Sequence, residues 1–333
     1  MEQLLLPSSN GVYQVPENGS VVSEGATSKV SPFIISNTQE VDFQEVKQKH
    51  IIPVFVKDNE PLISHCDFIE AAWEVAAHVY GDGNVSSPSI RVSHPIKGRS
   101  PEAKHKRADE LTEEEKTLYY ERMMFGLEIP CNTATIGGNT LSLFVGGVKA
   151  YSEDNLHNKK GVAEHFKAFV GFQNRVCTNL CVSSDGLVAD LRVTTMLELH
   201  NKLYDMMTNY NAREHLNRLE SLPGYQLSEK QFAQLIGRAR LYQYLPAEQK
   251  KDLPLFTFGD SQINSVCKDY YKDENFCREN DGSISLWKLY NLFTGANKSS
   301  YIDGFLNRAA NSSSFIHEIA RSLDQGKSNW FLK

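Results

Sequence analysis

Six basic residues between positions 91 and 107 are the feature of this sequence best suited to binding chemistry. They are Arg91, Lys97, Arg99, Lys104, Lys106 and Arg107. Glu102 is the single acidic residue among them, so the segment carries a net charge of +5. An exposed loop of this charge attracts phosphate groups, and the nearby Tyr119 and Tyr120 are able to stack on bases. We therefore predict a nucleic-acid-binding surface here, with Lys149 and Arg175 as outlying contributors.

The segment that follows supplies the opposing interpretation. Asp109 to Glu128 holds seven acidic residues against Lys116 and Arg122, a net charge of −5. The two segments could simply neutralise each other. The whole chain has 35 basic and 41 acidic residues, and a net charge of −6 opposes non-specific binding to nucleic acid. Both interpretations stay open at this point.

Motifs of the common enzyme classes are absent from the sequence. The run from Thr294 to Ser300 contains Lys298-Ser299, but it lacks the glycine that a phosphate-binding loop places before lysine. Gly295 within it is better explained as a helix C-cap. We predict no catalytic residue and no cofactor, and an enzyme of unrecognised type remains an alternative because catalytic groups can assemble from distant positions.

The cysteines give no sign of a metal site. Cys177 and Cys181 have a spacing that suits zinc, but Cys267 and Cys277 lie too far apart to form the second ligand pair. The sequence around the first pair is typical of a buried strand, in which cysteine packs as a small hydrophobic residue. We predict no metal and reduced thiols.

Length and composition indicate an ordinary globular protein. The chain has 333 residues, of which 41 % are hydrophobic and 23 % charged. We find no apolar run of the roughly 18 residues that a membrane helix needs, and the amino end lacks a secretory signal pattern. We expect a cytoplasmic protein without a membrane partner.

Hydrophobic periodicity predicts an α+β protein with a central antiparallel β-meander and a helical C-terminal half. We divide the chain into a flexible N-terminal arm (1–48), an α+β domain with the sheet (49–190) and a helical region packed on the sheet (191–333). Within the arm, the apolar run 33–35 is able to dock on the main body. The arm is rich in Ser, Asn, Gly and Thr, which bury too little apolar surface to order it.

The meander is expected from runs rich in Val, Phe, Leu and Tyr with turn signals between them. Gly137-Gly138-Asn139 predicts a hairpin turn, and Gly146-Gly147 indicates a bulge or a close approach of the backbone. Asp185-Gly186 is expected to close the β region. The predicted strands cover residues 51–56, 89–92, 119–130, 140–151, 164–174 and 175–182.

Capping signals place the helices. Ser64 and Asp67 have capping-box spacing before a helix that Gly81 ends, and Ser228 with Gln231 has the same spacing. The apolar stripe of Trp287, Tyr290 and Phe293 is typical of a helix facing the core. The predicted helices cover residues 67–80, 193–210, 229–244, 260–271 and 284–293, and two short helices precede Gly326.

Several strings, taken together, carry a family resemblance. The strings are Ser89–Arg99, Tyr119–Arg122, Phe144–Tyr151, Asn179–Val182 and Leu289–Tyr301. They resemble an uncharacterised bacterial family found on chromosomes, conjugative elements and phages of gut-type anaerobes, from about residue 45 to the end. Residues 175–179 and 289–291 are also faintly similar to the phage/plasmid-related protein family. The resemblance implies a mobile-element context and no catalytic activity.

From these observations we predict a non-catalytic mobile-element protein in DNA metabolism that binds or anneals single-stranded nucleic acid. A meander followed by a long helix also resembles strand-annealing proteins, which is an analogy of fold alone. The first alternative is a protein-interaction or regulatory factor that acts on a host process. The expected partner is single-stranded DNA or, for the alternative, a host or element-encoded protein, and the oligomeric state is left open.

Overall fold

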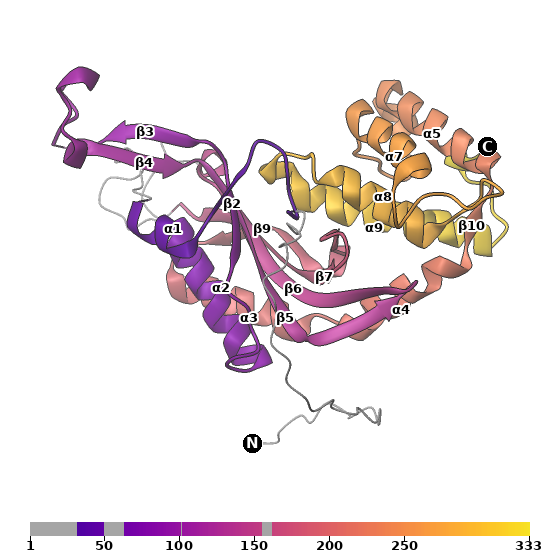
Figure 1. The fold of residues 1–333 in the computed structure, drawn as a ribbon, viewed down its shortest axis with the longest axis horizontal. Helices are drawn as coiled ribbons and strands as arrows, with labels where there is room; N and C mark the ends of the chain where they lie inside the picture. Colours follow the sequence, from indigo (N-terminus) through magenta and orange to yellow (C-terminus); the bar gives the residue numbers. More distant parts are fainter. Residues whose placement is uncertain (1–31, 50–62, 101, 155–161) are drawn as a thin grey trace, which may run out of the picture. The chain divides into compact units, whose positions relative to one another are not determined.

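The protein is described by a computed structural model that covers residues 32–49, 63–100, 102–154 and 162–333 (Figure 1). Within these ranges seven strands form one antiparallel sheet. Their order is β1 (Gln39–Val41), β2 (Ser89–Val92), β5 (Arg122–Ile136), β6 (Asn139–Ala150), β7 (Glu164–Asn174) and β8 (Leu180–Cys181), and β9 (Leu187–Val193) also pairs with β7. The strands β5, β6 and β7 follow one another both in the chain and in the sheet, which confirms the predicted α+β fold with a central meander.

The two glycine pairs of the meander act as the sequence indicates. Gly137 and Gly138 turn the chain from β5 to β6 with φ of 55° and 80°, a region that favours glycine. Gly146 and Gly147 let neighbouring groups approach the middle of β6. A Cβ on Gly147 would lie 2.3 Å from Cζ of Phe68, so the close-approach interpretation is the correct one. The irregularity in the β5–β6 ladder lies elsewhere, between Ile129 and Thr133 of β5.

Both faces of the sheet are covered, because alternate side chains of each strand point to opposite sides. On one face Phe125 packs edge-on against Phe68 of α2 (His65–Tyr80), with ring centroids 5.1 Å apart. On the other face Met124 belongs to a second buried cluster that contains Phe305 of α9 (Ile302–Asp324). Figure 1 shows α2 and α9 on either side of the sheet.

Local capping explains where α2 begins. The Ser64 hydroxyl accepts the Asp67 N–H at 3.0 Å, and the Asp67 carboxylate accepts the Ser64 N–H at 2.7 Å. Gly81 ends the helix with φ of 99°. The predicted capping box is therefore confirmed, and it fixes the first turn of the helix against the sheet.

The C-terminal half is helical, as expected. Ser228 caps α5 together with Gln231, which confirms the second capping box. Trp287, Tyr290 and Phe293 are buried in the core. The helices here are α3 (Met196–Asn209), α4 (Ala212–Ser221), α5 (Glu229–Tyr244), α6 (Ala247–Lys250), α7 (Asp260–Lys272), α8 (Leu286–Asn297) and α9.

Around α8 the structure differs from the sequence-based prediction. Residues 284–285 form β11, which pairs with β10 (Gln226–Leu227), so the helix begins two residues later than expected. It also continues past Gly295 to Asn297, so Gly295 is not its C-cap. The predicted pair of short helices is the single helix α9 of 23 residues, whose buried face overrides the weak helix propensity of its serines.

The end of the β region is also different. Residues 175–182 were expected to be a strand, but they form a turn in which Thr178 has φ of 57°, followed by the two-residue strand β8. Asp185-Gly186 does not close the sheet, because β9 follows it. Short hydrogen-bonded turns and short strands carry little periodicity, and propensity alone does not separate them.

Residues 32–48 lie in the segment expected to be a flexible arm, and they contact the sheet. β1 pairs with β2, and α1 (Phe43–Lys49) follows it. Phe33 and Ile34 are buried, and the Ile35 N–H donates to the Lys298 carbonyl at 2.8 Å, which confirms the expected docking of this run. Residues 1–31 and the strand expected at 51–56 lie outside the described residues, and the boundaries near 48 and 190 stay predictions.

Candidate functional site

The predicted basic segment forms a β-hairpin outside the main sheet. β3 (Pro95–Arg99) pairs with β4 (Lys116–Tyr120) as a separate two-stranded sheet, visible apart from the larger one in Figure 1. In this register Lys97 lies opposite Leu118 and Arg99 opposite Lys116. Because side chains alternate along a strand, Lys97, Arg99 and Lys116 lie on the same face of the hairpin. That face borders a pocket of about 510 Å³.

Part of the hairpin's charge is neutralised within its own loop. Lys106 pairs with Glu115, and Lys116 lies 2.5 Å from the Glu113 carboxylate. The hydrogen bond from Lys106 holds the pKa of Glu115 below its ordinary value. Arg107 lies 3.6 Å from Asp109, and both are strongly exposed. The sequence left open whether the acidic residues neutralise the basic segment. In the structure they do so for Lys106 and Arg107.

The other cations of the hairpin are differently placed. Among the described residues, neither Lys97 nor Lys104 forms an ion pair, and both are exposed. The Arg99 guanidinium donates to the Lys106 carbonyl and so helps to hold the loop. Lys97 and Lys104 are thus the exposed cations of the hairpin without an ion pair among the described residues, and Arg107 and Lys116 are exposed in weak surface pairs.

Two of the predicted residues lie outside the hairpin. Arg91, on β2, donates to Thr38 through Nε and Nη2, and burial lowers the pKa of its guanidinium. Arg175 lies beyond the end of β7, with Nη2 2.8 Å from a carboxylate oxygen of Glu128. The structure therefore does not bring all eight predicted residues together on one surface.

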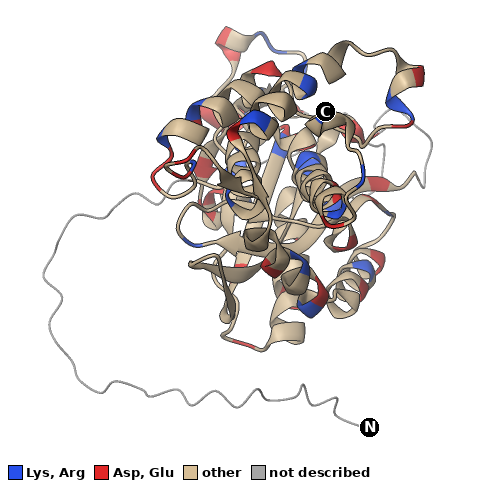
Figure 2. Ribbon diagram, turned by 90° about the vertical axis from the view of Figure 1, so that its right-hand side faces the viewer, with Lys and Arg blue, Asp and Glu red and all other residues tan. Residues whose placement is uncertain are grey.

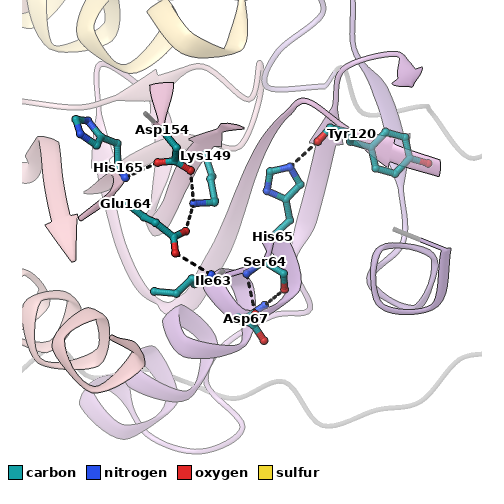
Figure 3. A network of polar contacts seen from close by, with 9 residues as sticks. All are labelled: Ile63, Ser64, His65, Asp67, Tyr120, Lys149, Asp154, Glu164 and His165. Atoms are coloured by element: carbon teal, nitrogen blue, oxygen red, sulfur yellow. Dashed lines mark hydrogen bonds and ion pairs between the residues drawn. The ribbon is translucent and has the colours of Figure 1, made fainter. Parts of the chain in front are cut away.

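Lys149 differs most from its predicted role. Its side chain is 0 % exposed, and its ammonium lies 2.8 Å from Glu164 and 3.1 Å from Asp154 (Figure 3). The same ammonium lies over the Phe166 ring, 3.9 Å from its centroid. A phosphate cannot reach a cation that is enclosed in this way. Lys149 is therefore not part of the proposed nucleic-acid-binding surface.

The network around Lys149 holds the fold together. The second oxygen of Glu164 accepts the Ile63 N–H at 3.0 Å, just before α2, and Asp154 accepts the His165 N–H at 2.7 Å (Figure 3). These bonds join β6, β7 and the start of α2. Since its carboxylates are committed to a cation and to backbone donors, we assign a structural role to this network.

A polar pocket of about 420 Å³ lies between η4 (Ser184–Gly186), α4 and α9. Its lining includes Ser183, Arg218, Ser313, His317 and Arg321. Arg218 pairs with Asp185 and Arg321 with Glu318, so each arginine is oriented by a carboxylate. The sequence gives no motif for this pocket, because its lining residues come from three segments that lie far apart in the chain.

Three side-chain groups of this pocket are buried without a hydrogen-bond partner among the described residues. They are the Ser183 hydroxyl, the Nε–H of Arg218 and Nε2 of His317. Ser183 as a whole is 3 % exposed. Buried polar groups are normally satisfied, so unsatisfied ones beside a cavity point to a ligand or bound water.

Next to this pocket, His215 is buried and bonded to the Tyr210 hydroxyl. Burial, helped by the positive charges of Arg218 and His317, lowers the pKa of His215 to about 3. Burial and the same arginine also lower the pKa of His317. Arg218 and Arg321 thus place two positive charges at this pocket, each paired with a carboxylate.

A larger groove, of about 690 Å³, runs between residues 251–255 and α9. Among its polar groups, Asn311 is bonded to the Leu255 carbonyl and to Thr257. Within the described ranges, no group of three or more His, Cys, Asp or Glu residues is placed to hold a metal ion. In the same part of the chain, none of the helices has the length and apolarity needed to cross a bilayer.

Two of the strings that carry the family resemblance meet inside the protein. Asn179 Nδ2 donates to the Asn291 carbonyl at 2.9 Å, and Lys298 Nζ donates to the Thr178 hydroxyl at 2.9 Å. Asn174 Nδ2 also contacts Asn291, at 3.3 Å. These polar side chains hold the turn before β8 against α8, which gives the strings a structural explanation.

Figure 2 shows basic and acidic residues interspersed along the helices of the side that it presents. No curated protein matches the chain, and no solved structure matches it either. One family model matches residues 15–332, and its description reads "Domain of unknown function, B. Theta Gene description (DUF3871)". With nearly the whole length matched, the chain belongs to this uncharacterised family.

Proposed function

We propose that the protein is a non-catalytic binding protein in DNA metabolism and that the β3–β4 hairpin contacts single-stranded nucleic acid. The observation that carries the proposal is the placement of Lys97, Arg99 and Lys116 on one face of the hairpin. The exposed Lys104 and Arg107 follow in the loop between the two strands. The mobile-element setting implied by the family resemblance belongs to this same proposal.

The ion pairs within the hairpin are compatible with this role. Arg107 and Asp109 are 80 % and 74 % exposed, and the partner of Lys116 is 89 % exposed. Exposed pairs of this kind contribute about 0–1 kcal/mol, so a phosphate can replace the carboxylate at small cost. The counterion release that follows phosphate binding then favours the complex at low salt.

The test is a fluorescence titration of a labelled oligo-dT with the full chain at two salt concentrations. The variant Lys97→Ser/Lys104→Ser/Arg107→Ser removes three exposed cations and leaves the loop-holding Arg99 in place. Each lost phosphate contact lowers the salt slope for a single strand by about 0.7, so the triple variant should lose roughly 2 in slope.

A matched control removes the same charge elsewhere. Lys230, Lys268 and Lys272 are exposed on α5 and α7, and their replacement by serine alters the net charge equally. The control should keep the affinity and slope of the parent. Equal losses in both triple variants would reject the hairpin as the contact, and an absence of any salt-sensitive binding by the parent would reject nucleic acid altogether.

A protein partner is the second candidate, and one specific observation favours it. The loop between β3 and β4 carries Glu113 and Glu115 within reach of Lys116 and Lys106, so the hairpin presents both signs of charge. Mixed charge suits a protein surface better than a polyanion. A partner recovered with the parent chain and lost with a hairpin variant, in the absence of salt-sensitive DNA binding, would identify this role.

A further inference from the structure

We infer that the polar pocket between η4, α4 and α9 binds a small phosphate-bearing ligand. The pocket's volume of about 420 Å³ lies within the range of small-molecule sites, roughly 300–1,000 Å³. It shares no element with the β3–β4 hairpin, so this inference does not depend on the proposed function.

Two of the three groups without a partner are able to donate, and the third, Nε2 of His317, is an acceptor in the neutral ring because Nδ1 faces the Ser313 carbonyl. The guanidinium of Arg218 is held by Asp185 through Nη2, which leaves its Nε–H without an acceptor among the described residues. An arginine N–H can only donate. The Ser183 hydroxyl lines the same pocket, is buried and also lacks a partner in the described part of the chain. A ligand that satisfies the Arg218 Nε–H must present an acceptor oxygen, and a phosphate that keeps one proton also presents an O–H to His317 Nε2.

The electrostatics favour an anionic acceptor over a neutral one. Arg218 and Arg321 both line the pocket, and their positive charges add to burial, the main cause, in lowering the pKa of His317. The Nδ1 of His317 lies 2.7 Å from the Ser313 carbonyl, which fixes the orientation of the ring. A tetrahedral oxyanion accepts several bonds at once, and arginine binds phosphate through paired N–H donors.

Two further serines of the pocket donate to backbone carbonyls. Ser221 donates to the Arg218 carbonyl at 2.7 Å, and Ser314 donates to the Ala310 carbonyl at 3.1 Å. Ser183 is therefore the group whose replacement should act on the ligand rather than on the fold, whereas replacing Arg218 also removes its ion pair with Asp185.

The experiment is a calorimetric titration of the full chain with inorganic phosphate at constant ionic strength. Arg218→Met should weaken binding at least about tenfold, since it removes a charge-assisted hydrogen bond. The matched control is Arg213→Met, which removes an exposed arginine of the same helix outside the pocket and should leave binding unchanged. A second titration with glycerol 3-phosphate distinguishes a phosphate ester, which should bind more tightly, from the free ion.

Ser183→Ala separates ligand binding from a structural role. Its hydroxyl has no described partner, so the unliganded variant should melt at the temperature of the parent or slightly above it. The rise in Tm that phosphate causes in the parent should be several-fold smaller in the variant. A parent chain that binds neither phosphate nor the ester at millimolar concentration, or an Arg218→Met variant that binds as the parent does, would overturn the inference.

Discussion

The ammonium of Lys149 lies 2.8 Å from Oε2 of Glu164, and the two side chains are 0 % and 3 % exposed. Asp154 supplies a second carboxylate to the same ammonium at 3.1 Å. Removing such charges from water is costly, and only their mutual attraction and the hydrogen bonds to Ile63 and His165 offset the cost. The arrangement makes each member dependent on the others.

Replacing Lys149 by Met should therefore destabilise the protein strongly. The substitution leaves two buried carboxylates without their cation, a change that costs about 3–5 kcal/mol in the free energy of unfolding. Urea denaturation of the parent and the variant measures the difference. Lys230→Met, at an exposed site, is the control and should alter stability little. A loss below about 1 kcal/mol at Lys149 would contradict the structural role.

The two glycines Gly147 and Gly237 should respond oppositely to replacement by alanine. A Cβ at Gly147 would lie 2.3 Å from the buried Phe68 ring and 2.8 Å from the Lys167 carbonyl, so the change should cost about 1–3 kcal/mol. Gly237 lies within α5 with open space around it, and alanine there should stabilise by about 0.5–1 kcal/mol. Thermal melts of the two variants test the pair, and shifts of the same sign would contradict the packing of β6 against α2.

Because His215 is buried, we expect the free energy of unfolding to decrease on acidification. Burial lowers its pKa from 6.5 to about 3. Between these two pH values His215 is protonated in the unfolded chain and neutral in the folded protein. Stability should fall through this window as the pH falls, with this residue contributing a slope of up to about 1.4 kcal/mol per pH unit. Urea midpoints measured from pH 7 to pH 4 should show a flatter dependence for His215→Gln. The exposed His94 provides the control, and an equal flattening in His94→Gln would argue against the assignment.

Asn291 should be required for the turn before β8. Its side-chain Oδ1 accepts from Asn174 Nδ2 at 3.3 Å, and its Nδ2 donates to the Trp287 carbonyl at 3.0 Å. Asn291→Ala leaves Asn174 without its side-chain partner inside the protein, and we expect a cost of about 1–3 kcal/mol. Asn307, which is exposed on α9, is a suitable control for the same substitution. Equal midpoints in urea for both variants would show that the network contributes nothing.

Local signals in the sequence were sufficient for much of the fold. The capping box of Ser64 and Asp67 is satisfied within four residues, and a two-glycine turn such as Gly137-Gly138 depends on φ alone. Apolar runs likewise identified the strands of the meander. Each of these features depends on neighbours in the chain, which is why sequence alone determined them.

Tertiary contacts decided the rest. In the sequence, Lys149 cannot be told from an accessible lysine. The structure shows that its side chain is buried and that Asp154 and Glu164 both contact its ammonium. The polar pocket likewise depends on Ser183 and Arg218 meeting across separate segments of the chain. Charge, burial and hydrogen-bond satisfaction are properties of groups close in space, and for residues far apart in sequence they are set only when the chain has folded.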